Sequence, residues 1–154
     1  MIVTLIAAVF SGCTLALYRV GRSKAGYGPY VREADWPRAL QALVKDDPSF
    51  RTNVTAYGLG DFIDHRSIWR LDRDSPLLDH MLSNINLEPT DVGHPKSSEL
   101  IGNVPYGWPS FDWTKCTWYA TPGYGAQHIE GVDLYLIAVD EKSGCAVALH
   151  EWLF

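Results

Sequence analysis

Apolar and polar positions follow two different periods along this chain, and together they predict two helices and about five strands. Apolar residues recur three and four positions apart, as on one face of a helix, in two stretches: Leu40, Leu43 and Val44, then Leu77, Leu78, Met81, Leu82 and Ile85. Five other stretches have the composition of strands, with β-branched or aromatic residues or with apolar and polar residues in alternation. They are 53–57, 67–71, 117–120, 132–139 and 145–153.

Capping residues and prolines set the expected ends of both helices. Asp35 is expected to cap the first helix, with Pro37 in the first turn, where a missing N–H costs nothing. That helix should end before Pro48, because a residue that precedes proline is pushed out of the helical region. Ser75 and Pro76 repeat the same pattern at the start of the second helix.

The order of these elements predicts an α+β domain. The expected strands come in groups, which favours an antiparallel sheet of about five strands with the two helices on one face. The last two strands, 132–139 and 145–153, are separated by a polar turn that ends in Gly144, the pattern of a β-hairpin. Residues 88–112 contain four prolines and little periodicity, so we expect an irregular loop with a short helical turn at 97–101.

The beginning of the chain differs from everything that follows it. Residues 2–18 carry no charged side chain, and as a helix they would span ~25 Å, slightly less than the ~30 Å hydrocarbon core of a bilayer. We therefore expect a hydrophobic membrane anchor or signal segment at 1–18. A basic and then Gly/Pro-containing linker at 19–34 would lead to a single α+β domain at 35–154.

Two routes to the membrane fit this segment. Its positive residues, Arg19, Arg22 and Lys24, follow the apolar stretch, whereas a secretory signal peptide carries them in front. For an uncleaved single span, the positive-inside rule favours a domain on the cytoplasmic side. Residues 10–13, Phe-Ser-Gly-Cys, resemble the processing site of a bacterial lipoprotein precursor, which implies that Cys13 is lipidated and the domain exported.

Composition excludes several classes of protein. Of the 154 residues, 47% are hydrophobic and 20% are charged, as in ordinary globular domains, which excludes a disordered or low-complexity chain. The formal net charge of −5 argues against a nucleic-acid partner, because such a partner requires a basic surface.

Six tryptophans are many for this length; Trp108 falls in the expected irregular loop and Trp113 directly follows it. Trp118 and Trp152 lie in expected strands, where a core position is the simpler interpretation. Large rings with a polar edge in a loop are typical of protein interfaces. We therefore expect a non-catalytic accessory module that binds a protein partner through the Pro/Trp-rich loop 104–113, at Tyr106, Trp108, Phe111 and Trp113.

An enzyme is the main alternative, with a purely structural subunit of a membrane or envelope complex as a third. A carboxylate beside a histidine can orient it for acid–base work or share a metal, so a metal-assisted hydrolase would use Asp61, Asp64, His65 and His128. The zinc motifs HExxH and Cys-x-x-Cys and the nucleophile motif Gly-x-Ser-x-Gly are all absent, and we predict no cofactor. His150 and Glu151 are adjacent, so on a strand they would point to opposite faces.

Cys116 and Cys145 both fall at the starts of expected strands. If those strands were neighbours in the sheet, the two thiols would come within bridging range, and an exported domain would form the disulfide. On the cytoplasmic side they would remain reduced.

Overall fold

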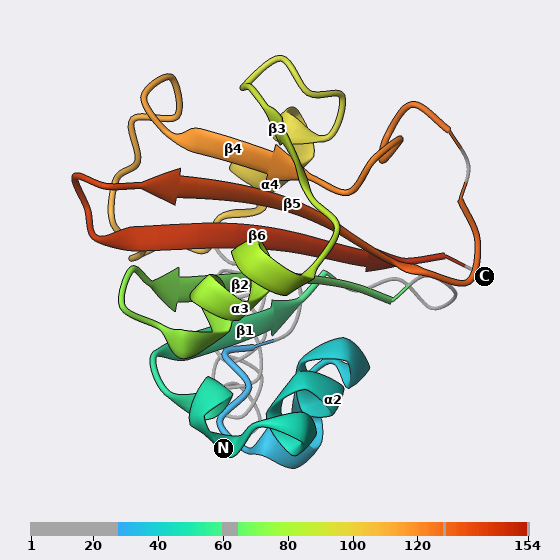
Figure 1. The fold of residues 1–154 in the computed structure, drawn as a ribbon. Coiled ribbons are helices and arrows are strands. Elements are labelled where there is room, and N and C mark those ends of the chain that lie inside the picture. The colour runs from blue at the N-terminus through green and yellow to red at the C-terminus, as the bar shows by residue number, and fades with distance from the viewer. Residues whose placement is uncertain (1–27, 60–64, 128, 154) are drawn as a thin grey trace, which may run out of the picture.

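The computed structural model describes residues 28–59, 65–127 and 129–153. Six strands form one antiparallel sheet in the order β1-β2-β6-β5-β4-β3 (Figure 1). The strands are β1 Val54–Gly58, β2 His65–Asp72, β3 Glu88–Thr90, β4 Thr117–Ala120, β5 Asp133–Asp140 and β6 Cys145–Trp152. The helices are α2 Arg38–Asp46, α3 Pro76–Asn84 and α4 Ser97–Asn103, with single 3-10 turns η1 Glu33–Asp35 and η2 Pro48–Arg51.

The expected α+β class with an antiparallel sheet is confirmed, and the sheet has one strand more than expected. The additional strand is β3, which lies within the stretch expected to be an irregular loop. It has three residues, and its Pro89 is paired with Tyr119 of β4. Because proline cannot donate a backbone hydrogen bond, it is tolerated in a strand at the edge of a sheet, which is where β3 lies.

The β5–β6 hairpin is confirmed over the full length of both strands. Its register runs from Asp133 opposite Trp152 to Asp140 opposite Cys145. Gly144 closes the turn with a φ of 67°, a conformation that glycine adopts without steric cost.

Helices α2 and α3 cover one face of the sheet. Their apolar sides form a core with the strand residues beneath them, among them Trp69 and Ala148. Most of the helical stripes predicted from the sequence are buried here, at Leu40, Val44, Leu77, Leu78 and Met81.

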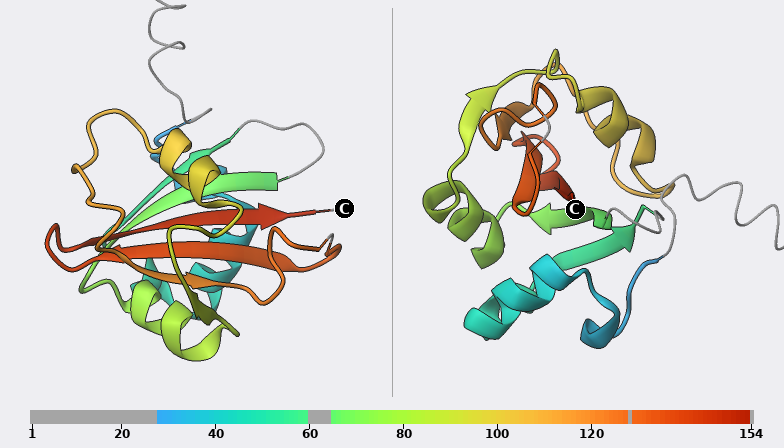
Figure 2. Two further views of the ribbon diagram at one scale, coloured as in Figure 1. Left: turned by 90° about the horizontal axis from the view of Figure 1, so that it is seen from above. Right: turned by 90° about the vertical axis from the view of Figure 1, so that its right-hand side faces the viewer.

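The opposite face is also covered, by α4 and the chain that follows it. Figure 2 shows α3 and α4 on opposite sides of the sheet. Leu100 of α4, Phe111 and Tyr124 pack there against strand residues such as Leu136 and Leu149. A central strand covered on both faces buries every side chain, which explains the continuous apolar runs of β5 and β6.

The expected start of α2 needs correction, whereas α3 begins at Pro76 as expected. Asp35 belongs to the 3-10 turn η1, and its carboxylate binds the guanidinium of Arg32 instead of capping α2, which begins at Arg38. Ser75 stands at the N-cap of α3, but its hydroxyl donates to the carbonyl of Thr52 and not to the helix. Helix α2 ends at Asp46, before Pro48, as the sequence predicts.

The expected anchor, residues 2–18, and the expected lipidation residue Cys13 lie outside the described residues. Within the part of the chain that the structure describes, no helix has the length and apolar character needed to cross a bilayer.

Candidate functional site

A cavity of about 660 Å³ lies between α2 and one end of the sheet. It is lined by aromatic, acidic and basic side chains together with small residues of α2, namely Tyr30, Asp35, Trp36, Pro37, Arg38, Ala39, Ala42, Gly58, His65, Arg66, Asp133, His150 and Trp152. This volume is within the range of small-molecule sites.

The strand register places the lining residues of the sheet in two adjacent rows. His65 of β2 and Asp133 of β5 are both paired with Trp152 of β6, which forms the outer row. Two residues further along each strand, on the same face of the sheet, Ser67 and Tyr135 are both paired with His150.

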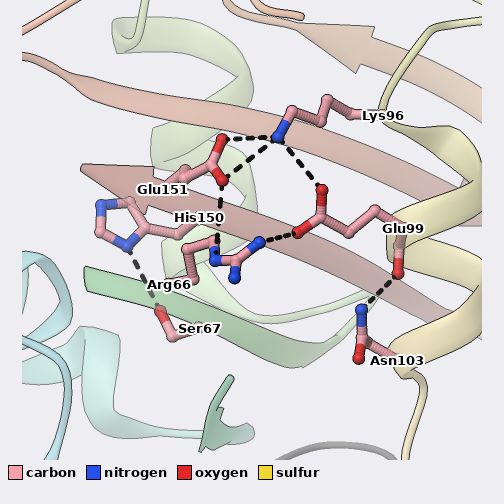
Figure 3. A network of polar contacts seen from close by, with 7 residues as sticks. All are labelled: Arg66, Ser67, Lys96, Glu99, Asn103, His150 and Glu151. Atoms are coloured by element: carbon pink, nitrogen blue, oxygen red, sulfur yellow. Dashed lines mark hydrogen bonds and ion pairs between the residues drawn. The ribbon is translucent and has the colours of Figure 1, made fainter. Parts of the chain in front are cut away.

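A chain of hydrogen bonds leads from the core to the cavity. The indole N–H of Trp69 donates to Ser67 Oγ at 2.8 Å. Ser67 Oγ lies 3.3 Å from His150 Nδ1, and His150 Nε2 lies 2.8 Å from Asp133 Oδ1. Figure 3 shows the contact between Ser67 and His150. Every polar atom is satisfied when the Ser67 hydroxyl donates to Nδ1 and the Nε2–H of a neutral imidazole donates to the Asp133 carboxylate.

His150 is fixed in this position. Its side chain is buried, and its ring stacks on Trp69 at 5.3 Å between centroids and contacts Tyr135 at 5.1 Å. Both ring nitrogens are engaged within the protein. His150 therefore positions the carboxylate of Asp133, whose side chain is half exposed.

The N-terminal part of the domain builds the wall opposite. Tyr30 donates its backbone N–H to the carbonyl of Ala56 in the edge strand β1, and its own carbonyl accepts the indole N–H of Trp36 at 3.1 Å. Gly58 lies directly against the Tyr30 side chain, and a Cβ at this position would collide with the hydroxyl oxygen. The segment before α2 is thus held along β1.

A second polar cluster lies on the other face of the same strands (Figure 3). Arg66 and Glu151 are paired across β2 and β6, and both contact residues of the α4 region. Lys96 Nζ lies 3.1 Å from a carboxylate oxygen of Glu151 and 3.1 Å from one of Glu99, and Arg66 binds Glu99 at 2.7 Å. The expectation that His150 and Glu151 point to opposite faces is therefore confirmed.

Of the residues expected for a hydrolase, the structure describes His65. It lines the cavity and stacks on Trp152 with 6.0 Å between ring centroids. Asp61, Asp64 and His128 lie outside the described residues. Among the residues that the structure does describe, no three His, Cys, Asp or Glu side chains form a group able to hold a metal ion.

The four aromatic residues of loop 104–113 differ in their exposure. Tyr106 is 83% exposed, whereas Phe111 is buried. Trp108 and Trp113 are half-buried and pack on the second core, Trp108 against Tyr57 and Trp113 against Phe111. Whether the loop binds a partner stays a prediction, but Trp108, Phe111 and Trp113 already pack on the domain itself.

The disulfide considered possible between Cys116 and Cys145 is not formed in the structure, where both are free thiols. The strands that they begin are not neighbours, because β5 lies between β4 and β6. Two strand spacings place the Cα atoms on the order of 9–10 Å apart, beyond the ~7 Å limit for a bridge. Burial raises the pKa of the Cys116 thiol to about 11.

Sequence reasoning missed His150 and Asp133 as site residues. A signal was present, because two polar residues, His150 and Glu151, stand inside an otherwise apolar strand. In a strand covered on both faces such residues require buried partners, although nothing local identifies those partners.

Comparisons of this chain with models of protein families, with curated proteins and with solved structures find no significant match.

Proposed function

We propose that this domain is a non-catalytic binding module that holds a small ligand in the cavity beneath α2. The observation that carries the proposal is the oriented carboxylate of Asp133, held by a buried histidine at the edge of an aromatic-walled cavity. Ligand sites typically combine apolar walls with a few polar groups in fixed positions.

The two buried members of the hydrogen-bond chain, His150 and Ser67, are not placed for catalysis. A general base needs a nitrogen or oxygen free to reach the substrate proton, and His150 uses one ring nitrogen on Ser67 and the other on Asp133. Ser67 is fully buried and does not line the cavity, so it has no access to a substrate.

Filling the cavity tests this proposal. Ala42 is exposed on α2 and lines the cavity, so Ala42→Trp places an indole inside it without disturbing the core. A library of small aromatic fragments is screened by ligand-observed NMR against the full chain. We expect fragments that bind the wild type to lose binding to Ala42→Trp and to keep it with the control Asp46→Trp, at an exposed position away from the cavity on the same helix. Absence of fragment binding to the wild type would contradict the proposal.

We further propose that residues 2–18 tether the module to a membrane, as a single span or through a lipid on Cys13. The support is the uncharged stretch followed by basic residues. Carbonate extraction of membranes tests this, because a tethered protein stays with the membrane pellet. Recovery of the intact chain in the soluble fraction would contradict it.

A protein partner at loop 104–113 is a second candidate function, favoured by the exposure of Tyr106. Tyr106→Ala is expected to abolish capture of that partner while leaving the fold unchanged. Capture of the same protein by wild type and variant would contradict this role.

A further inference from the structure

We propose that the ligand of the cavity is a small amine, whose cationic nitrogen pairs with Asp133 and whose apolar body packs among the aromatic walls. This inference rests on the proposed binding function and names the chemical class of the ligand.

The charges that line the cavity leave one acidic group for a ligand. Asp35 is bound through both carboxylate oxygens by Arg32. Arg66 is engaged by Glu99 on the opposite face of the sheet. Among the described residues, the carboxylate of Asp133 has one hydrogen-bond partner, His150 at Oδ1, and its second oxygen has no hydrogen bond or ion pair.

The side chain of Asp133 is also held more rigidly than that of Arg38, a cationic residue that lines the same cavity. Arg38 lines the cavity from the exposed first turn of α2, and it makes no ion pair with another described residue. A long exposed side chain loses rotamer freedom when it binds an anion. The Asp133 carboxylate is already held at 2.8 Å by a buried ring, so binding a cation orders little that was free before.

The walls favour the same class of ligand. Tyr30, Trp36 and Trp152 line the cavity around this carboxylate. Aromatic rings attract cations through their electron-rich faces and also offer apolar area. A molecule that joins an ammonium group to an apolar body uses both properties, whereas an anionic ligand would face the Asp133 carboxylate.

Three probes that share a phenyl ring on a short alkyl chain, but differ in charge, distinguish the effect of charge on binding from the effect of shape. They are 2-phenylethylamine, the neutral 2-phenylethanol and the anionic 3-phenylpropanoate, titrated into the full chain at pH 7 by calorimetry. We expect the amine to bind at least about tenfold more tightly than the alcohol, since a hydrogen bond to a charged group contributes that much or more. The carboxylate probe should bind most weakly.

Asp133→Asn should remove the preference for the amine and leave the affinity for the alcohol unchanged, which also reports that the cavity is still folded. Glu141→Gln is the matched control, because it removes the same charge just beyond the other end of β5. At ~3.3 Å per residue it lies about 26 Å from Asp133, well beyond the screening length of roughly 10 Å. The control should keep the full preference.

The outcomes distinguish this inference from the proposed function. Equal affinity for amine and alcohol, tightest binding of the carboxylate probe, or an amine preference that survives Asp133→Asn would each overturn the cation assignment while leaving the cavity a binding site. If none of the probes binds the wild type, and the fragment library finds no ligand that Ala42→Trp excludes, the proposed function fails as well.

Discussion

Replacing Glu151 by glutamine is expected to lower the free energy of unfolding by about 2–3 kcal/mol. The change keeps the size of the side chain and removes its negative charge. Glu151 is buried at the end of β6, where its carboxylate contacts Lys96 at 3.1 Å and lies 3.8 Å from Arg66. With the charge gone, two cations face the single carboxylate of Glu99.

The magnitude follows from the burial of the partners. Breaking a fully buried ion pair by removing one partner costs about 3–5 kcal/mol, because a charge is left without compensation. Glu151 meets that condition with a side chain only 4% exposed, but Arg66 and Lys96 are 26% and 27% exposed and keep some contact with water. The expected loss therefore falls just below the fully buried range.

The pH dependence of this cluster has a definite sign. Burial lowers the pKa of Lys96, but hydrogen bonds to Glu151 and Glu99 outweigh it and raise the pKa above the ordinary 10.5. A cationic group with a raised pKa in the folded state stabilises the fold below its unfolded pKa. Its contribution is thus fully present at neutral pH and is lost only as pH rises through the raised value.

Urea unfolding followed by tryptophan fluorescence measures the effect. Glu141→Gln is the control, since Glu141 is 69% exposed beside Arg73 and should change stability by less than about 0.5 kcal/mol. Lys96→Met in the Glu151→Gln background should recover part of the loss, because it removes the uncompensated cation. If Glu151→Gln unfolds within about 0.5 kcal/mol of the wild type, with an unchanged dependence on urea, the argument from burial is refuted.

Three further predictions concern the core and the thiols. Trp108→Ala and Trp113→Ala should each lower the free energy of unfolding by roughly 1.5–3 kcal/mol, which is less than the loss expected for a fully buried ring. Tyr106→Ala should change it by less than about 0.5 kcal/mol. A larger loss for Tyr106→Ala than for the two tryptophan variants in urea unfolding would refute this prediction. Ser67→Ala should lower the free energy of unfolding by roughly 2–3 kcal/mol in the same assay, because it leaves the indole N–H of Trp69 and Nδ1 of His150 without partners. An unchanged free energy of unfolding would show that water replaces the hydroxyl. Labelling of Cys116 by a thiol reagent should be slow at pH 8 and rise about tenfold per pH unit toward its pKa of about 11, so a rate that levels off near pH 9 would contradict the burial of the thiol.

The parts of the fold that the sequence predicts well are those decided by local chemistry. The β5–β6 hairpin follows from two apolar runs and a turn that ends in Gly144. Helix α3 follows from Pro76 and an apolar stripe. In each case neighbours along the chain carry enough information, because the turn residues and the helical period act within a few positions.

Other elements depend on contacts that no local pattern contains. Strand β3 is three residues long with a proline in the middle, and only its pairing with β4 makes it a strand. Asp35 has every local property of a helix cap, yet Arg32 three residues earlier binds its carboxylate through both oxygens. Because both carboxylate oxygens of Asp35 accept hydrogen bonds from Arg32, they do not accept hydrogen bonds from the first N–H groups of α2.

The candidate site was unpredictable for the same reason. Ser67 and His150 are 83 residues apart, and His150 is 17 residues from Asp133, so no motif spacing links them. They meet because β6 lies between β2 and β5 in the sheet. Three of the four hydrolase candidates chosen from the sequence, Asp61, Asp64 and His65, are instead neighbours along the chain, and the structure places His65 at the cavity.

The β2–β6 ladder explains why a cavity and a buried ion cluster occur at the same end of the sheet. Arg66 opposite Glu151 and Ser67 opposite His150 are successive steps of that ladder, and successive residues of a strand face opposite sides. Both faces are covered by helices or loops, so each pair is largely shielded from bulk water and needs partners in its own layer. On one face α4 and Lys96 supply those partners. On the other face the chain of partners ends, among the described residues, at Asp133, whose half-exposed carboxylate lines the cavity and is the point at which we propose that a ligand binds.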